Sequence, residues 1–325
     1  MQEQSAAVRR VLRQLAGAPA SSIETLLAPL YDQEVAWHGP HPLNDCAGIG
    51  AYVDTFWRPL LEACPDLERR DDILLGGPFR GERWLASTGH YVGTFANDWL
   101  GIPHTGGVLN IRFGEFSRFE GGRIVESYVI LDLLDVLRQA GLEPRWRSLG
   151  AEDRVPGPAT QDGIISAPAD AGETARSLDL VERMIAGLME YDGRSLASMG
   201  MERFWHPRMM WYGPGGIGTT RGLAGFQAHH QEPFLRAFPD RKGGDHKARL
   251  AEGAYVASTG WPSVRATHTG DGWLGMAATG KRVGMRVMDF WRAEGSLLVE
   301  NWVFIDIIDL LLQMGVDVLA GLKKP

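Results

Sequence analysis

The chain has 325 residues, of which 44% are hydrophobic and 22% charged; this composition is typical of globular proteins, and the length suffices for two domains. The formal net charge is −7 and no basic run is interleaved with aromatic residues, so neither nucleic acid nor a membrane surface is an expected partner. Only two cysteines are present, Cys46 and Cys64, which excludes a disulfide framework and favours the reducing cytoplasm. Three aspartates interrupt the most apolar segment, residues 303–322, so we expect no membrane span.

Motifs of the first half return in the second half. Trp37-His38-Gly39-Pro40 recurs as Trp211-Tyr212-Gly213-Pro214, and Trp99-Leu100-Gly101 recurs as Trp273-Leu274-Gly275, both at an offset of 174 positions (211 − 37 and 273 − 99). A register kept over this distance indicates two copies of one domain rather than a solenoid of short repeats. We predict copy one over residues 1–142 and copy two over 175–325. The linker between them, 143–174, is rich in Pro, Gly and Ala and is expected to lie on the surface.

Each copy is predicted to open with helical segments. Apolar residues recur at helical spacing near the start of both copies, and a short strand carrying Trp37 or Trp211 follows. A further helix is predicted over residues 48–64 and 222–238, where Pro59 and Pro233 should kink or shorten it. The residues that indicate the first helices are Val8, Val11, Leu12 and Leu15 in copy one, and Leu178, Val181, Ile185 and Leu188 in copy two.

Strand-like runs fill most of the remainder of each copy. The turn signals Glu120-Gly121-Gly122 and Glu294-Gly295-Ser296 separate the last two runs, which therefore form a hairpin. Each copy then ends in a short helix that stops at Gly141 or Gly315. Helices followed by antiparallel strands predict an α+β fold in each copy, with the helices on one face of the sheet.

Several motifs carry a resemblance to a known family. They are LGIPHTG over 100–106 and LGMAATG over 274–280, the hairpin runs GGRIVESY and GSLLVENW, and the terminal segments 132–141 and 306–315. In these motifs the chain resembles the SnoaL-like polyketide cyclase family, whose fold is the cone of the nuclear transport factor 2 type. The resemblance covers nearly all of both copies. It implies a curved sheet around an apolar pocket, no metal or cofactor, and pairing of two domains, which here predicts an intramolecular pseudo-dimer.

The resemblance leaves two functions open, because one fold supports many activities. The founding cyclases of the family close a ring by aldol condensation with an Asp as general acid/base. The resemblance therefore implies a cofactor-free acid/base enzyme, of the cyclase, isomerase or dehydratase type, acting on a small apolar molecule that bears a carbonyl group. The alternative is a non-catalytic small-molecule-binding protein of the same fold.

The hairpin turn predicts which residues share a face of the sheet. If Glu120 faces Arg123, then Glu115 faces Tyr128, and side-chain alternation places carboxylates and aromatic residues together. The residues predicted to share a face are Ile111, Phe113, Glu115, Glu126, Tyr128, Ile130 and Asp132 in copy one, and Met285, Val287, Asp289, Glu300, Trp302, Phe304 and Asp306 in copy two.

Four carboxylates are candidate acid/base groups, because a carboxyl in a dry cavity has a raised pKa and can exchange protons near neutral pH. They are Asp132 and Glu115 in copy one, and Asp306 and Asp289 in copy two. Asp132 and Asp306 could instead cap the terminal helices. Glu115 and Asp289 could instead pair with nearby arginines, namely Arg112 or Arg118 and Arg286 or Arg292.

Aromatic and histidine side chains complete the predicted site. His38 and Tyr212 follow the strand tryptophans and could each orient a substrate oxygen, or could simply lie at a pocket rim. His229 and His230 are predicted to be surface residues, and no metal site is expected. The predicted pocket lining for a flat apolar molecule is Trp37, Phe113, Tyr128, Trp211, Trp302 and Phe304.

Overall fold

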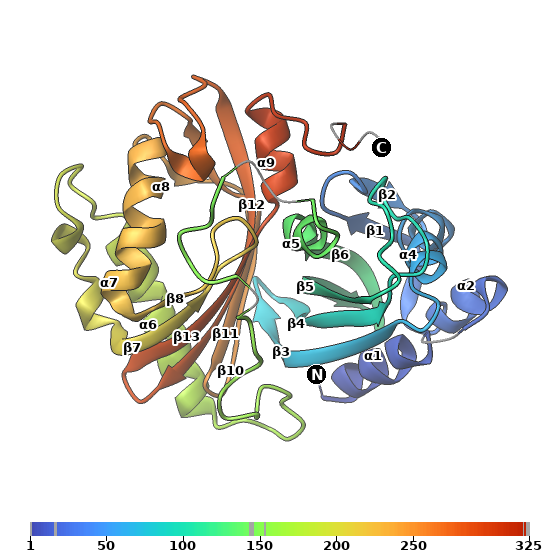
Figure 1. The fold of residues 1–325 in the computed structure, drawn as a ribbon. Helices are drawn as coiled ribbons and strands as arrows, with labels where there is room; N and C mark the ends of the chain where they lie inside the picture. The colour runs from blue at the N-terminus through green and yellow to red at the C-terminus, as the bar shows by residue number, and fades with distance from the viewer. Residues whose placement is uncertain (1, 16–17, 143–145, 153, 321, 323–325) are drawn as a thin grey trace.

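The structure is a computed structural model that describes residues 2–15, 18–142, 146–152, 154–320 and 322. Residues 143–145 and 153 of the predicted linker, residues 1 and 16–17 of copy one, and residues 321 and 323–325 of copy two therefore lie outside the described residues. Two curved sheets lie side by side in the centre of the molecule, and most of the helices cover their outer faces (Figure 1). This arrangement is the α+β architecture that the element order predicts, in the two tandem cone-shaped domains that the family resemblance implies.

Copy one contains a six-stranded sheet in the order β2-β1-β6-β5-β4-β3, in which only β1 and β6 run parallel. Its strands are β1 (Tyr31–His38), β2 (Asp45–Ala47), β3 (Glu68–Phe79), β4 (Glu82–Thr94), β5 (Val108–Glu120) and β6 (Arg123–Leu131). Its helices are α1 (Gln2–Gln14), η1 (Ala20–Ser22), α2 (Ile23–Leu27), α3 (Ile49–Tyr52), η2 (Val53–Trp57), α4 (Arg58–Ala63) and α5 (Leu133–Gln139).

Copy two repeats this plan with a sheet in the order β10-β11-β12-β13-β7-β8, and a short strand, β9, also pairs with β11. Its strands are β7 (Trp205–Tyr212), β8 (Thr220–Arg221), β9 (Lys242–Gly243), β10 (His246–Glu252), β11 (Tyr255–Thr267), β12 (Arg282–Glu294) and β13 (Leu297–Ile305). Its helices are α6 (Ala171–Leu188), η3 (Leu196–Met199), η4 (Met201–Arg203), α7 (Gly222–Phe226), η5 (Gln227–Gln231), α8 (Glu232–Ala237), η6 (Trp273–Gly275) and α9 (Ile307–Gln313).

The helix that crosses each sheet is interrupted, as its proline predicts. In copy one a π-helical turn, η2, directly precedes Arg58 and Pro59, and in copy two η5 precedes Glu232 and Pro233 in the same way. Proline has no N–H to donate to the carbonyl four residues earlier, so the hydrogen-bond pattern of an α-helix cannot run through it. The same local chemistry therefore gives both copies the same helix shape.

The predicted register of the hairpin is wrong by one residue. Glu120 does pair with Arg123, but a β-bulge follows, so that Arg118 pairs with Glu126 and Glu115 with Val129. Copy two has the same bulge, and there Asp289 pairs with Val303. An extra residue in one strand turns all following side chains of that strand to the other face. The residues of β6 and β13 predicted to share the face of Glu115 and Asp289 therefore point the opposite way, and these are Glu126, Tyr128 and Ile130 in copy one and Glu300, Trp302 and Phe304 in copy two.

Those reversed side chains form the contact between the two copies. They belong to a buried apolar cluster that draws residues from both sheets, and we call this contact the seam. At the seam Phe116 packs on Phe290, with ring centroids 5.6 Å apart, and these two residues are counterparts in the repeat (290 − 116 = 174). Equivalent residues contact each other where two similar units are related by an approximate two-fold axis.

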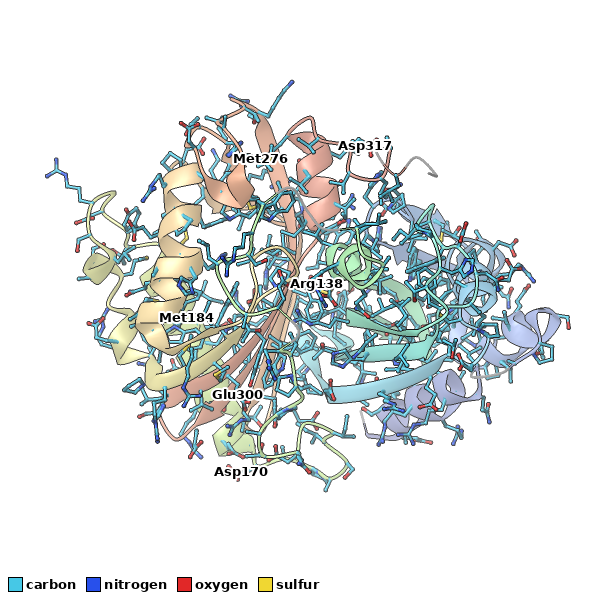
Figure 2. The ribbon with its side chains drawn as sticks, in the orientation of Figure 1. Arg138, Asp170, Met184, Met276, Glu300 and Asp317 are labelled. Carbon is cyan, nitrogen blue, oxygen red and sulfur yellow. The ribbon has the colours of Figure 1, made fainter. Side chains whose placement is uncertain are left out.

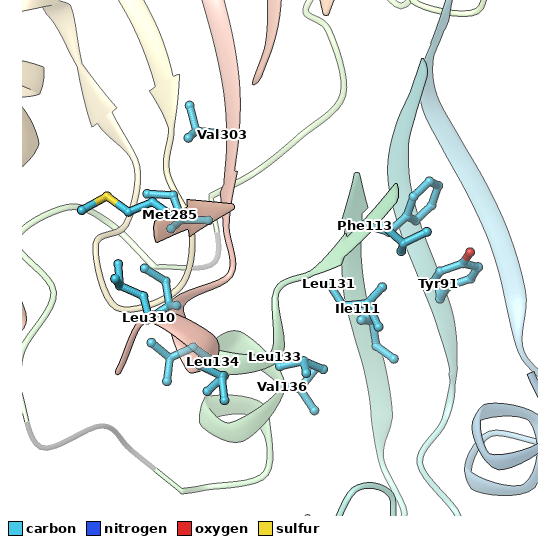
Figure 3. Packing of buried hydrophobic residues seen from close by; sticks show 14 of the residues in the cluster. Tyr91, Ile111, Phe113, Leu131, Leu133, Leu134, Val136, Met285, Val303 and Leu310 are labelled. Carbon is cyan, nitrogen blue, oxygen red and sulfur yellow. The ribbon is translucent and has the colours of Figure 1, made fainter. Parts of the chain in front are cut away.

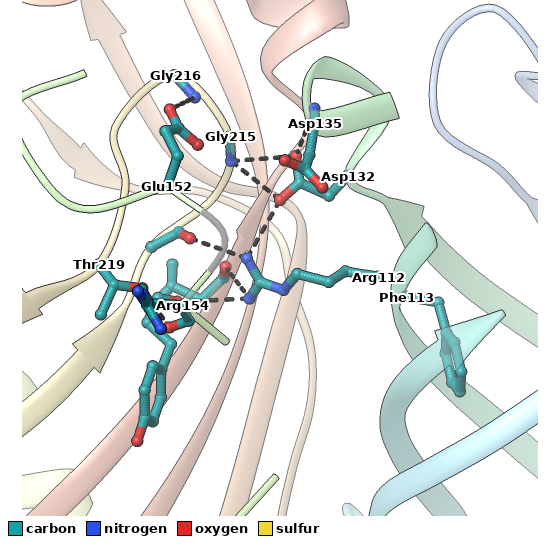
Figure 4. A network of polar contacts seen from close by, with 12 residues as sticks. Arg112, Phe113, Asp132, Asp135, Glu152, Arg154, Gly215, Gly216 and Thr219 are labelled. Carbon is teal, nitrogen blue, oxygen red and sulfur yellow. Dashed lines mark hydrogen bonds and ion pairs between the residues drawn. The ribbon is translucent and has the colours of Figure 1, made fainter. Parts of the chain in front are cut away.

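Polar contacts cross the seam in the same reciprocal manner. The carboxylate of Asp132 accepts from the backbone N–H of Gly215 at 2.9 Å (Figure 4). The carboxylate of Asp306 accepts from the backbone N–H of His41 at 3.1 Å. The repeat offset relates both members of these pairs (306 − 132 = 174 and 215 − 41 = 174). The terminal helices α5 and α9 meet beside them, with Leu134 near Leu310 (Figure 3).

The described residues of the linker before α6 are mostly exposed or half-buried, and some of them also contact the seam. Trp302 Nε1 donates to the carbonyl of Pro156 at 2.8 Å, the Tyr255 hydroxyl donates to Asp162, and Ile164 pairs with Leu74 as a parallel bridge. Buried polar groups need hydrogen-bond partners, and these contacts supply some of them. The helix α6 begins at Ala171, inside the predicted linker.

No helix of the described residues is both long and apolar enough to cross a bilayer.

Candidate functional site

The helix-covered face of the first sheet is filled by large side chains. Tyr91 and Phe113 lie there with ring centroids 4.7 Å apart, and the guanidinium of Arg69 lies 4.2 Å from the centre of the Phe113 ring (Figure 3 shows Tyr91 and Phe113 on neighbouring strands). All three side chains are buried. The interior of copy one is therefore a packed core at the place where the family resemblance implies a pocket.

Arg69 also binds Glu115, the candidate carboxylate of copy one. It donates to Glu115 at 2.7 Å, to Asp71 at 2.9 Å, to Ser87 at 2.8 Å and to the Tyr91 hydroxyl at 3.1 Å. The Glu115 carboxylate is therefore bound in a buried ion pair and does not face an open cavity. The partner is neither of the two arginines expected from the hairpin.

Those two arginines have other partners. Arg112 lies 3.1 Å from Asp132, and Arg118 donates to Glu126 at 2.9 Å. In copy two Arg286 and Arg292 are bound to Asp306 and Glu300 in the same way, at 3.1 and 2.5 Å. The hairpin arginines therefore bind carboxylates at the seam and its edge, and none of these carboxylates is Glu115 or Asp289.

The strand pairings identify what replaces Arg69 in copy two. In copy one Arg69 pairs with Tyr91, and Tyr91 with Ile111. In copy two the counterpart of Ile111 is Met285, which pairs with Val264, which in turn pairs with Gly243. Gly243 and Val264 thus stand where copy one has Arg69 and Tyr91. Val287 stands at the repeat position of Phe113 (287 − 113 = 174).

The loss of three large side chains opens a cavity of about 410 Å³ in copy two. It is lined by α6, the segment α7–η5–α8, β9 and β10, with β12 and β13 as its floor (Figure 2 labels Met184 of α6). The size suits a small organic ligand. The lining includes Met184, Leu188, Trp205, Trp211, Phe226, His230, Phe234, Val264, Met285, Val287, Asp289, Trp291, Asn301, Val303 and Ile305.

Asp289 places a carboxyl group on the floor of this cavity. Asn301 Nδ2 donates to its Oδ1 at 3.3 Å, and no Lys or Arg of the described chain forms an ion pair with it. Burial raises the pKa of Asp289 to about 7, against the smaller lowering effects of the Asn301 hydrogen bond and the Arg249 charge. A carboxyl with this pKa is present in both protonation states at neutral pH, as a proton-transfer group requires.

His230 faces the same cavity, so its prediction as a surface residue is wrong. Its ring stacks on Trp211 with centroids 4.4 Å apart and lies between Phe226 and Phe234, one helical turn away on either side. Burial lowers the pKa of His230 to about 3, so the ring is neutral at physiological pH. Its Nδ1 is buried and has no hydrogen-bond partner among the described residues. The Phe-His-Phe spacing in the sequence was the available signal, since it places His230 on an apolar helix face.

His38 and Tyr212 lie outside both interiors. His38 is 3.2 Å from Asp45 and stacks on Tyr128 at 4.5 Å, whereas Tyr212 donates to Glu300 at 3.2 Å and stacks on Trp302 at 5.2 Å. Each directly follows an interior tryptophan in a strand, and consecutive strand residues point to opposite faces. Both side chains therefore lie on the seam side of their sheets.

The helix-capping interpretation of Asp132 and Asp306 is confirmed. Asp132 accepts from the N–H of Asp135 at 3.4 Å, and Asp306 accepts from the N–H of Asp309 at 3.3 Å. Burial raises the pKa of each carboxyl to about 6, against the charge of Arg112 or Arg286. Both carboxyls are engaged at the seam, where Figure 4 shows Asp132 between Arg112 and Gly215.

The six aromatic residues predicted to line a pocket have three different locations. Trp211 lines the cavity of copy two. Trp37 and Phe113 lie in the packed interior of copy one, where Trp37 stacks on Tyr52 and Phe56 at 5.2 and 5.5 Å. Tyr128, Trp302 and Phe304 lie at the seam because of the bulge. Within the described part of the chain, no three His, Cys, Asp or Glu side chains are arranged to hold a metal ion.

The raised pKa of Asp289 predicts a pH dependence of stability. An unfolded aspartate titrates at about 3.9. The folded protein therefore favours the neutral form of Asp289. The resulting gain in folding stability is complete below pH ~3.9 and is lost as the pH rises through about 7. Relative to Asp289→Asn, the native protein is expected to lose a few kcal/mol of unfolding free energy across this window, because each tenfold change in proton affinity corresponds to about 1.4 kcal/mol. Urea denaturation of both proteins at several pH values measures this, and parallel curves would contradict it.

The fold and the site define a class: a tandem pair of cone-shaped α+β domains, one with a packed interior and one with a cavity that holds a carboxyl group. The family model described as SnoaL-like polyketide cyclase matches residues 10–140 and 192–314, which together are more than half of the chain. The chain belongs to the SnoaL-like polyketide cyclase family, and the resemblance seen in its motifs is confirmed.

Solved structures similar to this chain include IdmH from Streptomyces antibioticus, a candidate polyketide cyclase. It is 20% identical, with 43% of this chain and 96% of that chain covered and a TM-score of 0.35. A candidate SnoaL-like polyketide cyclase from Jannaschia sp. CCS1 is 18% identical over 44% and 94%, with a TM-score of 0.35. AclR from Streptomyces galilaeus, a candidate hydroxylase, is 26% identical over 44% and 82%, also with a TM-score of 0.35. No curated protein matches the chain.

Proposed function

We propose that copy two carries the active site of an acid/base enzyme of the cyclase, isomerase or dehydratase type. Its substrate is a small, flat, mostly apolar molecule that bears a carbonyl group, and Asp289 transfers the proton. The observation that carries this proposal is the contrast between two equivalent positions. Glu115 is bound by Arg69 in a packed core, whereas Asp289 faces an open cavity and has no cationic partner of this kind.

The lining residues support a proton transfer next to a carbonyl group. Asp289 as carboxylate takes a proton from the carbon beside the carbonyl, and the C–H bonding electrons pass to the carbonyl oxygen to give an enolate. His230 is neutral, and the N–H of a neutral imidazole ring can donate a hydrogen bond to that enolate oxygen. In a cyclisation the enolate carbon then bonds to a second carbonyl carbon of the same molecule, and the proton on Asp289 passes to the second oxygen. In an isomerisation it returns to a different carbon.

We also propose that the two copies form an intramolecular equivalent of the homodimer of their family, so that copy one supports the floor of the working cavity. The reciprocal seam contacts favour this assignment. On β12 and β13 the seam residues Phe290 and Trp302 alternate with Asp289 and Asn301. Since the same strands carry both sets, packing at the seam restrains the position of the carboxyl group.

Gly243→Arg is expected to give copy two the closed interior of copy one. The arginine should fill the cavity and pair with Asp289, so binding of a neutral apolar probe such as N-phenyl-1-naphthylamine should weaken by about tenfold or more. Probe fluorescence measures this. Gly243→Ala is the matched control, because a Cβ at Gly243 meets open space and its φ is not in the left-handed region. Equal binding by the native protein and Gly243→Arg would show that the cavity is not the ligand site.

A further inference from the structure

The cavity of copy two has a basic edge. Arg241, Lys242 and Arg249, from the segment 241–249, line it beside α6, where Arg241 donates to the carbonyl of Leu188 at 2.9 Å and Arg249 donates to Glu182 at 3.4 Å. The rest of the lining is mainly aromatic and aliphatic. Among the described lining residues the only acid is Asp289. Cations grouped on one edge of an otherwise apolar cavity favour a ligand that is negatively charged at one end.

Arg249 is the best placed of these cations. It pairs with Ser258 across the sheet, and Ser258 pairs with Asp289, so the three residues form one rung of the sheet. With strands about 4.8 Å apart, the backbones of Arg249 and Asp289 are separated by about 10 Å, which is the scale of a small ring system. In copy one the equivalent position is Leu74, which pairs with Ser87. The basic edge therefore belongs to the copy that has the cavity.

Two hydrogen-bonding atoms on this edge lack partners. Arg249 Nη1 donates outward to Glu182 at 3.4 Å, but Arg249 Nε is buried and has no acceptor among the described residues. His246 Nε2, in the same lining, is also buried without a partner in the described chain. A buried donor without an acceptor is costly, by about 1–3 kcal/mol. Such atoms around a cavity indicate the place of a polar ligand group.

We propose that the ligand of copy two is an organic monoanion, a flat apolar molecule whose carboxylate binds at Arg249 and His246 and whose carbonyl lies toward Asp289. This inference rests on the proposed function, because it names the substrate class of the same cavity. Glu182 already offsets part of the Arg249 charge, which favours a carboxylate over a doubly charged phosphate. The bound carboxylate would also weaken the lowering effect that Arg249 exerts on the pKa of Asp289.

A matched pair of probes tests the charge of the ligand. 2-Naphthoate and 2-naphthamide have the same ring and similar shape and differ in charge, and each is measured by displacement of N-phenyl-1-naphthylamine from the native protein near neutral pH. The carboxylate is expected to bind about tenfold or more tightly than the amide, as befits one charge-assisted hydrogen bond in a dry site. Equal affinities, or no saturable displacement by either probe, overturn the proposal.

Variants then locate the preference. Arg249→Leu, which copies Leu74 of copy one, is expected to reduce the preference to within about twofold while the amide binds as before. Arg249→Gln serves the same purpose if the leucine variant does not fold. Arg265→Leu is the control, since Arg265 is an exposed cation on β11 outside the cavity lining and its loss should keep the preference. A preference that survives at Arg249→Leu and Arg249→Gln overturns the assignment.

The catalytic proposal has a separate readout. Asp289→Asn is expected to keep the preference for the carboxylate, because the preference comes from the opposite edge of the cavity. If the preference is absent but Asp289→Asn still abolishes turnover, the anionic ligand is wrong and the acid/base site stands. If the preference is present but Asp289→Asn leaves turnover unchanged, the anion site stands and the acid/base function is wrong.

Discussion

Asp289→Asn is expected to lower the turnover number on a carbonyl substrate by about 10²–10⁴-fold, the usual contribution of a positioned general acid or base. Asparagine keeps the size and the hydrogen bond from Asn301 but cannot accept the proton. Where the ionised form acts as base, the native rate should rise with pH through about 7, the pKa of Asp289, and the residual rate of the variant should lose that dependence. Steady-state kinetics across pH measure both effects.

Glu115→Gln is the matched control for this result, because it makes the same chemical change at the equivalent position of copy one. Glu115 is already bound to Arg69, so turnover should stay at the native level in the fraction of protein that is folded. A similar loss of turnover in both variants would place catalysis elsewhere or in both copies. No loss at Asp289→Asn, combined with intact probe binding, would leave copy two as a ligand-binding cavity without catalysis.

Arg69→Met is expected to lower the free energy of unfolding by about 3–5 kcal/mol, because it leaves two buried carboxylates without their cation. The guanidinium of Arg69 bridges Asp71 and Glu115 at 2.9 and 2.7 Å, and both carboxylates are almost fully removed from solvent. Methionine keeps much of the apolar packing against Phe113, so the loss reports the charge. Urea denaturation followed by circular dichroism measures it.

Two further variants isolate the cause of that loss. Arg118→Met removes a partly exposed cation from Glu126 and should cost less than about 1 kcal/mol, as for most surface ion pairs. Combining Arg69→Met with Glu115→Gln and Asp71→Asn should recover part of the lost stability, since no buried charge then remains unpaired. If Arg69→Met costs no more than Arg118→Met, the cluster contributes nothing to the stability of copy one.

Local patterns predicted much of the fold correctly. The apolar spacing around Val8 and Leu178 placed α1 and α6, the prolines placed the helix interruptions, and the turn glycines placed the hairpins. The alternative role given to Asp132 and Asp306 as helix caps was also correct. These features depend on interactions between residues a few positions apart, so the sequence contains their causes directly.

The candidate site was predicted less well for a specific reason. Side chains alternate between the two faces of a strand, so one inserted residue moves every later side chain to the other face. Each hairpin has such a bulge, beside Arg118 in copy one and Arg292 in copy two. Asp289 and Glu115 remained on the inner face, but Tyr128 and Trp302 moved to the seam. His38 and Tyr212 each follow an inward-pointing tryptophan in a strand, so their side chains point to the opposite face, toward the seam.

By itself the sequence determined that the molecule is a duplicated α+β domain of the SnoaL-like family, because a repeat with a constant offset is visible without any knowledge of contacts. Only the tertiary structure decided which copy has a cavity. Gly243 is the repeat counterpart of Arg69 (243 − 69 = 174), but Arg69 and Glu115 are 46 positions apart in the chain, so the sequence does not show that Arg69 fills the interior and pairs with Glu115. Whether a carboxylate is paired or free depends on such distant neighbours, which burial brings together and local patterns do not specify.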